Sequence, residues 1–265
     1  MDTIKVNQKT KNLMSVKFSF QRLLMLITAI LVASMTFTAC TKDDGNGGDD
    51  GGDNGGGNGG VAGKRLKSVV TSSNSLKMPD DIRSEYSYNN DGTLKRVDHF
   101  NNKSKNLVSY EIFTSNSDGT IAKSEQSSQE YFIVFEYSYD ANKKPLKCKI
   151  SQFVEGKLVQ TTNVDYTFEN GKKIRAVHKF DIPGVVLTTY FQYDYTYDSQ
   201  GRRTKTTLTS MPDGLSTQST RTYNTDGTLQ KITRPIDATD NTPVTETYTW
   251  ENGKSPHNPD DYNPW

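Results

Sequence analysis

Within residues 64–255, the side chains best suited to chemistry are Cys148, His99 and His178. A cysteine nucleophile needs a base within hydrogen-bond reach, and the stretch "PLKCKIS" around Cys148 contains no histidine. The two histidines lie in different copies of a repeat, whereas metal ligands must lie within about 2 Å of one ion. We therefore expect Cys148 to be a small core residue and the histidines to lie on a surface or in a groove. We expect no metal and no cofactor.

Catalytic signatures are absent from the sequence. It contains no Gly-x-Ser-x-Gly, no His-Glu-x-x-His and no phosphate-binding loop. Adjacent acids such as Asp80 and Asp81 point apart on a strand, unlike the two carboxyl groups that converge across a glycosidase cleft. The sequence thus predicts a protein that is not an enzyme, and a hydrolase ranks last among the functions it leaves open.

Cys40 has a different setting, because it follows a segment typical of secretion. Five basic residues and one acid precede the apolar run Leu23–Met35. This run is shorter than the roughly 20 residues of a membrane-spanning helix, and it fits the apolar region of a signal peptide. The stretch "FTAC" resembles the lipobox of bacterial lipoproteins. The resemblance implies that residues 1–39 are removed and that Cys40 is acylated, for example with palmitate; an ordinary signal peptide with an incidental cysteine is the alternative.

Acidic residues directly after the cysteine indicate a destination. Lys42, Asp43 and Asp44 resemble the export signal of Bacteroidetes surface lipoproteins. That resemblance implies an outer-membrane lipoprotein exposed on the cell surface, with a periplasm-facing position as the alternative. The rest of residues 40–63 is mostly Gly, Asp and Asn, which predicts a flexible tether.

The charge of the remaining chain excludes one class of partner. From residue 63 onward the sequence has 26 basic and 25 acidic residues, so it has no basic field that would attract a phosphate backbone. We expect no nucleic-acid partner, and we expect contact with the membrane only through the N-terminal lipid.

Residues 64–255 repeat with a period of about 27 residues, the signature of a repeat architecture. Each copy reads Tyr-x-Tyr, then polar turn residues, then Gly, as in "YSYNNDGTLKRV" (86–97). Alternating aromatic residues predict a strand, and Asn or Asp followed by Gly predicts a hairpin turn. The spacing Gly-x-apolar-x-x-apolar, as in Leu94 and Val97, predicts a β-bulge just past the turn.

These features predict an all-β fold, a long antiparallel meander of about 14 strands. Open twisted sheets rarely exceed about ten strands, so we expect a curled open sheet or a roll. Residues 256–265 form a polar tail. The repeat resembles the YD repeats of Rhs-type proteins, and more closely the YD-like repeat lipoproteins of Bacteroidetes, a family of unknown function.

The aromatic residues of the repeats are the candidate binding residues, because both aromatics of a copy should point to one face. Either they stack as a core, or they form a platform for sugar rings or a partner protein. The candidates are Tyr86, Tyr88, Tyr137, Tyr139, Tyr166, Tyr195, Tyr197, Tyr223, Tyr248 and Trp250.

The sequence as a whole predicts a lipid-anchored, non-catalytic protein of the cell envelope. Its leading interpretation is a binding or adhesion module for a glycan or protein ligand. The alternative is a structural envelope lipoprotein without a small ligand.

Overall fold

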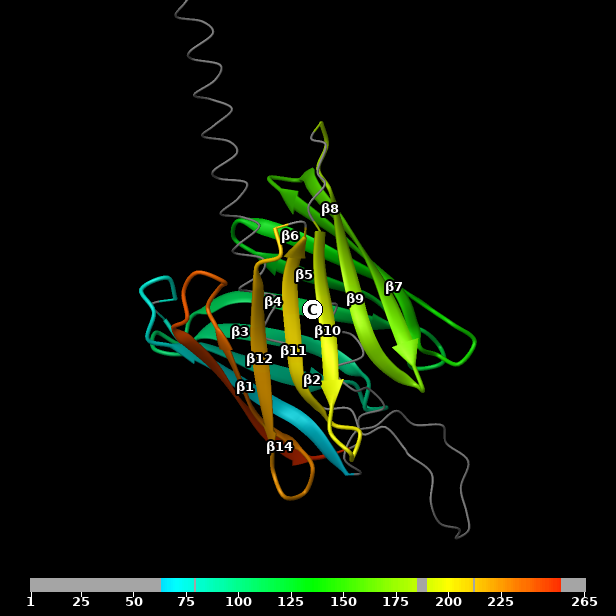
Figure 1. The fold of residues 1–265 in the computed structure, drawn as a ribbon, viewed down its shortest axis with the longest axis vertical. Helices are drawn as coiled ribbons and strands as arrows, with labels where there is room; N and C mark the ends of the chain where they lie inside the picture. The colour runs from blue at the N-terminus through cyan, green and yellow to red at the C-terminus, as the bar shows by residue number, and fades with distance from the viewer. Residues whose placement is uncertain (1–62, 79, 185–189, 212, 254–265) are drawn as a thin grey trace, which may run out of the picture. The chain divides into compact units, whose positions relative to one another are not determined.

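The described part of the chain, in a computed structural model, comprises residues 63–78, 80–184, 190–211 and 213–253. It contains fourteen antiparallel strands, each paired with its neighbours in sequence, and β1 pairs with β14. The sheet is therefore a closed barrel. The expectation of a curled open sheet or roll is wrong, because both outer strands find a partner in each other (Figure 1).

The strands are β1 (Lys64–Ser73), β2 (Ile82–Tyr88), β3 (Leu94–Asn101), β4 (Leu107–Ser115), β5 (Ile121–Ser128), β6 (Tyr131–Tyr139), β7 (Pro145–Val154), β8 (Lys157–Glu169), β9 (Lys172–Asp181), β10 (Tyr190–Tyr197), β11 (Arg203–Met211), β12 (Ser216–Tyr223), β13 (Leu229–Pro235) and β14 (Pro243–Asn252).

Closure of the barrel completes the last repeat. In the first and sixth copies the second aromatic pairs with the leucine after the turn: Tyr88 pairs with Leu94, and Tyr223 pairs with Leu229. At the seam between β1 and β14, Trp250 pairs with Leu66 in the same way, and the same register shift follows. Strand β1 thus takes the place of the strand that would follow Gly253, and the seventh hairpin is divided between the two ends of the chain.

The glycine turns form because side chains take up the backbone groups that the turn leaves unpaired. In the first copy the Asn89 amide donates to the Thr93 hydroxyl at 2.8 Å, and the Thr93 N–H donates to the Asp91 carboxylate at 2.9 Å. Gly92 has a φ of 87°, which glycine adopts without strain. The second and sixth copies repeat these bonds. Lys143 takes the glycine position in the third copy with a φ of 63°.

The bulge predicted from the apolar spacing is confirmed. Tyr88 pairs with Leu94 and Ser87 pairs with Arg96, so Lys95 is an extra residue on β3. Each of the other glycine-turn hairpins and the seam has the same shift. A bulge twists the strand and restores the alternation of inward and outward side chains beyond it.

The inner face of the barrel is only partly apolar. One cluster consists of Leu66, Val69, Leu229, Ile232 and Tyr248, with further aromatic rings packed against it. Buried apolar residues continue around the barrel, but they alternate with buried polar side chains, which include His99, Glu111, Ser124, Gln126, Gln152, Gln160, Thr162, His178, Arg203, Arg221 and Glu246.

Several predictions from the sequence concern segments outside the described residues. They are the signal peptide 1–39, the lipidation site Cys40, the export residues Lys42, Asp43 and Asp44, the tether up to residue 62, and the tail 256–265. Within the described residues, we find no helix with the length and apolar character to cross a membrane.

Candidate functional site

The aromatic residues of the repeats line the inner face of the barrel. Tyr166, Tyr195 and Tyr248 are buried, and the other candidates are half-buried. The Lys173 ammonium lies 5.1 Å from the ring centre of Tyr166 and 5.5 Å from that of Tyr195. In the described structure these rings are packing partners of interior side chains, and they do not form an exposed platform.

Five of these aromatic side chains also have a bonding role, which we call the carbonyl latch. Each donates a hydrogen bond to a carbonyl near the start of the preceding strand, at a point where the backbone ladder has ended. The ladder between β1 and β2 ends at Ser68 and Glu85, and the Tyr88 hydroxyl then donates to the Leu66 carbonyl at 2.7 Å. The other donor–acceptor pairs are Tyr139–Ile121, Tyr197–Lys173, Tyr223–Arg203 and Trp250–Leu229.

The two histidines lie inside the barrel, so the expectation of a surface or groove position is wrong. The strand register turns both of them inward: His99 Nδ1 is 2.8 Å from the Ser84 hydroxyl, and the His178 ring packs 4.7 Å from the ring of Tyr193. Among the described residues no three metal-binding side chains gather into a group. Cys148 is buried, and burial raises the pKa of its thiol, so the reactive thiolate is disfavoured.

Glu111 is the interior carboxyl with the most unusual acidity. It is buried on β4, and burial raises its pKa to about 7. Burial has the opposite effect on His99, whose pKa falls to about 4. A carboxyl with a pKa near neutrality suits proton transfer, but Glu111 is only 6% exposed. The position inside the barrel gives a substrate little access to it.

The barrel wall has an opening, the β12–β13 notch, where two neighbouring strands stop pairing. Pairing between β12 and β13 ends at Thr220 and Thr233. Continuing the same register would place Gln218 opposite Pro235, which has no N–H to give to the ladder. The next strands remain paired further along, β13 with β14 as far as Pro235 and Pro243. The proline therefore accounts for the point at which the wall parts.

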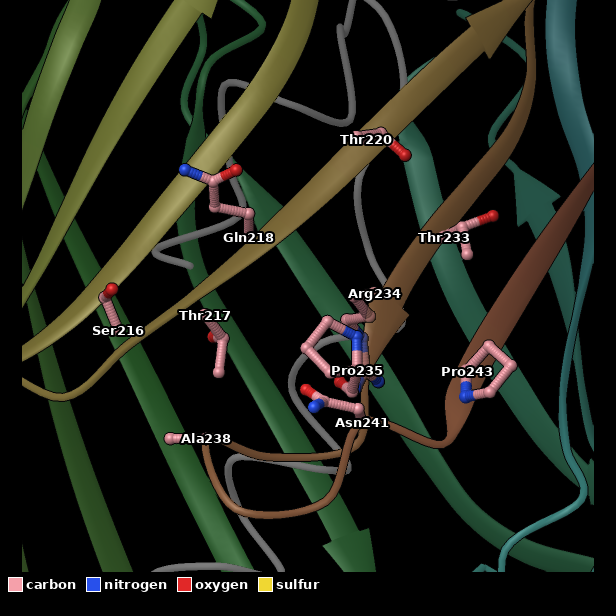
Figure 2. Close-up of a pocket in the computed structure, with 10 residues that line it drawn as sticks. All are labelled: Ser216, Thr217, Gln218, Thr220, Thr233, Arg234, Pro235, Ala238, Asn241 and Pro243. Atoms are coloured by element: carbon pink, nitrogen blue, oxygen red, sulfur yellow. The ribbon is translucent and has the colours of Figure 1, made fainter.

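The notch is a hollow of about 410 Å³ with a polar lining. Figure 2 shows β12 and β13 diverging below Thr220 and Thr233, with the loop that carries Ala238 and Asn241 at the open end. Hydroxyl and amide groups dominate the lining, which includes no aromatic side chain among the described residues. The lining residues are Ser216, Thr217, Gln218, Thr220, Thr233, Arg234, Pro235, Ala238, Asn241 and Pro243.

Arg234 is the charged residue of the notch lining, and it is only 8% exposed. Its Nε lies 3.5 Å from the Glu246 carboxylate, and its Nη1 is 3.5 Å from the Pro235 carbonyl. Its Nη2 has no hydrogen-bond partner among the described residues. Glu246 also accepts a hydrogen bond from Tyr248 at 2.8 Å. Burial raises the pKa of Glu246, and the nearby guanidinium groups of Arg234 and Arg221 oppose that shift.

Sequence reasoning missed every residue of the notch. It assigned residues 237–243, "DATDNTP", to a turn between repeats and attached no further meaning to the flanking prolines. The available signal was Pro235 directly after an alternating strand, because a proline there indicates an edge or an interruption of the sheet. The guanidinium could not have been found in the same way, since the sequence does not show that Arg234 lies buried against Glu246 on β14.

Comparisons with known sequences give no relative: no family model matches the chain, and no curated protein matches it.

Comparisons with solved structures give distant backbone similarities. A porin-like protein from Bacteroides uniformis ATCC 8492 is 11% identical, with a TM-score of 0.42, and the alignment covers 70% of this chain and 98% of that chain. A porin-like protein from Bacteroides vulgatus ATCC 8482 is 10% identical, with a TM-score of 0.46 and the same coverage. The Tc holotoxin pore of Photorhabdus luminescens is 15% identical, with a TM-score of 0.26, over 63% of this chain and 10% of that chain. The chemistry of the notch must therefore come from its own residues.

Proposed function

We propose that this protein is a non-catalytic binding module of the cell envelope, and that its ligand enters the β12–β13 notch. The observation that carries the proposal is the end of pairing between β12 and β13 at Thr220 and Thr233, beside Pro235. The notch is lined by polar side chains that a ligand could contact. A binding site of this kind is typically a hollow with a few well-placed polar groups.

The outer wall supports attachment to the membrane by a lipid on Cys40. Outward-facing side chains at the strand centres form ion pairs, such as Arg96–Asp98 at 2.6 Å and Arg175–Asp194 at 2.7 Å. Charged groups of this kind lose their hydration in hydrocarbon at a high free-energy cost. The proposal therefore keeps this wall in water and assigns the membrane contact to the acylated cysteine.

The direction of the strands supports display of the notch away from the anchor. The chain enters the barrel at Lys64, which pairs with Asn252 at the end that carries the glycine turns. The notch lies at the other end of the strands, beside the start of β12 at Ser216. From the sequence motifs we propose that the chain is a Bacteroidetes-type surface lipoprotein with YD-like repeats, with Lys42, Asp43 and Asp44 as the export signal and the cell surface as its location.

Membrane attachment is tested by labelling cells with an alkyne analogue of palmitate. We expect label on the wild-type chain and none on Cys40→Ala, which should leave the membrane fraction. Replacement of Lys42, Asp43 and Asp44 by alanine should keep the label but protect the chain from protease added to intact cells. Label on the Cys40→Ala chain would contradict lipidation at this residue, and unchanged protease sensitivity of the alanine variant would contradict the export signal.

Binding is tested on arrays of glycans and of peptides with the purified full-length chain. Gln218→Trp should fill the notch and abolish binding, because Gln218 lines it. Thr222→Trp is the matched control, since Thr222 is an exposed residue of the same strand beyond the notch. Equal loss of binding in both variants, or silence of the wild type on both arrays, would overturn the binding function.

A structural envelope protein is the second candidate function. The observation that favours it is the carbonyl latch, which ties successive repeats together inside a closed wall. Under this alternative, deletion of the protein weakens the envelope against detergent, and Gln218→Trp restores resistance as well as the wild type does.

A further inference from the structure

The free edge of β12 presents backbone groups to the notch. The Ser210 N–H donates to the Leu215 carbonyl, which closes the hairpin between β11 and β12. Along an antiparallel pair, bonding to one neighbour alternates with every second residue. Thr217 and Ser219 therefore face β11, and the peptide groups of Ser216 and Gln218 face the notch.

The opposite side of the notch cannot take up these groups. The Ile236 N–H donates to the Thr242 carbonyl, so the same alternation turns Pro235 toward β12. Pro235 offers a carbonyl but no N–H. Pairing with β13 ends before Gln218, and the Gln218 carbonyl has no N–H opposite it at Pro235. A backbone edge of this kind accepts an added strand, as in other cases of peptide binding by strand addition.

The shape of the notch requires the added strand to end inside it. The two walls meet where Thr220 pairs with Thr233, so a segment that enters from the open end must stop there. Arg234 follows directly on Thr233, and its Nη2 has no hydrogen-bond partner among the described residues. A guanidinium group binds a carboxylate with two parallel hydrogen bonds, and this one is nine-tenths buried.

The buried charges on this side also favour an anion. Two guanidinium groups, of Arg234 and Arg221, lie near the single carboxyl of Glu246, and both affect its ionisation. Arg221 also donates to the Thr206 hydroxyl at 2.8 Å. A carboxylate placed beside the Arg234 guanidinium would meet a positive charge that is screened less than a charge at the surface.

We propose that the β12–β13 notch binds the C-terminal end of an extended peptide, whose backbone pairs with β12 at Gln218 and whose terminal carboxylate pairs with Arg234. This inference rests on the proposed binding function and names the ligand class for the same site. Entry from the open end with the carboxylate foremost makes the peptide parallel to β12 and antiparallel to β13.

The first experiment tests the carboxylate with the purified full-length chain. Two fluorescent pools of random hexapeptides are titrated and followed by anisotropy, one pool with free C-terminal carboxylates and one amidated. We expect the free-acid pool to bind at least tenfold more tightly. Equal binding of the two pools would overturn the role of the terminal carboxylate.

The second experiment tests the strand pairing with two substitutions at one position. Both Gln218→Ala and Gln218→Pro remove the side chain, but only the proline removes the N–H that faces the notch. That N–H is outside the ladder with β11, so the proline should leave the barrel folded. We expect binding within twofold of the wild type for Gln218→Ala and at least tenfold weaker binding for Gln218→Pro. Equal binding by the two variants would overturn strand addition.

A third variant, Arg234→Gln, tests the guanidinium. It should weaken binding of the free-acid pool at least tenfold and leave binding of the amidated pool unchanged, so that the two pools bind with equal affinity. A retained preference for the free acid would overturn the role of Arg234. If circular dichroism shows that this variant does not fold, the comparison of the two pools and the Gln218 pair still decide the proposal.

The outcomes separate this inference from the proposed function. Notch-dependent binding of glycans, with no binding of either peptide pool, would retain the binding function and overturn the peptide ligand. Absence of binding to glycans and to both peptide pools would overturn both.

Discussion

At the scale of single residues, the interior of the barrel controls which charges are tolerated. Glu111 and His99 are both buried, and burial shifts their pKa values in opposite directions, toward the uncharged form of each. Because the folded protein favours protonated Glu111 but neutral His99, stability must depend on pH from both sides. Glu111 changes the folding stability between about pH 4.5 and 7, and His99 changes it between about pH 4 and 6.5.

Glu111→Gln should remove the loss of folding stability that accompanies a rise in pH toward 7. The pKa of Glu111 is raised to about 7 in the folded protein from an ordinary 4.5, so stability is full below pH 4.5 and falls as the pH rises toward 7. Above pH 7 the variant should be more stable than the wild type by about 3 kcal/mol, and at pH 4 the two should be equal. Urea unfolding at pH 4, 6 and 8 measures the difference.

Glu136→Gln is the control for this experiment, because Glu136 is an exposed carboxyl on β6. Its effect on the free energy of unfolding should be small at all three pH values. A constant difference between Glu111→Gln and the wild type across the range would contradict a buried carboxyl. His99 contributes in the opposite sense: its pKa is lowered to about 4, so stability is lost as the pH falls below 6.5.

At the scale of elements, the repeat predicts its hairpins well but leaves out how neighbouring hairpins hold together. The glycine turns and the bulge at Leu94 and Val97 are local, and local spacing reveals them. The carbonyl latch is not local, because Tyr139 reaches a carbonyl of Ile121 on the strand before it. The sequence shows the alternating tyrosines. It cannot show that the second tyrosine donates to a carbonyl beyond the last backbone pair of the ladder.

Two substitutions test the latch in opposite directions. Tyr139→Phe removes the hydroxyl that donates to the Ile121 carbonyl at 2.7 Å, and the expected cost is about 1 kcal/mol of folding stability. Phe168 occupies the equivalent position in the fourth copy, and Pro145 is the first residue of the preceding strand β7, as Ile121 is of β5. Phe168→Tyr should add the missing bond and stabilise the barrel by about 0.5–1 kcal/mol. Chemical denaturation measures both, and destabilisation by both variants would contradict the latch.

At the scale of the whole molecule, closure was the feature that sequence reasoning did not foresee. The segment "GKRLKSV" at 63–69 has the apolar spacing of a strand that follows a glycine turn, with Leu66 and Val69 at the two apolar positions. The last copy ends at Gly253 without such a strand of its own. The segment at 63–69 supplies the strand that the last copy lacks. This match becomes visible only when the sequences at the two ends of the barrel are compared. The notch had a local signal in Pro235, but the contact of Arg234 with Glu246 on β14 could not be found from the sequence.

Closure is tested by a disulfide across the seam. Val70 and Thr247 are paired residues on β1 and β14, and paired residues of antiparallel strands have Cα atoms about 4.5–5.5 Å apart, within the range of a disulfide. Val70→Cys with Thr247→Cys should form a bond on mild oxidation, and mass spectrometry should find the two peptides linked. Val70→Cys with Thr207→Cys, on β11, is the control and should stay unlinked. Linkage in the control alone would contradict the seam.

Because β1 and β14 pair like the two strands of one hairpin, no strand of the ring is distinguished as the first by its pairing. The Gly253 N–H donates to the Gly63 carbonyl at 3.0 Å, so the two ends of the barrel segment already touch. A peptide bond made there, together with a cut in one of the six other repeat turns, would give a circularly permuted chain with the same neighbours around the ring. The native order of the strands is therefore one of seven equivalent ways to thread the same architecture, and the position of the break decides only where the preceding segment leaves the barrel.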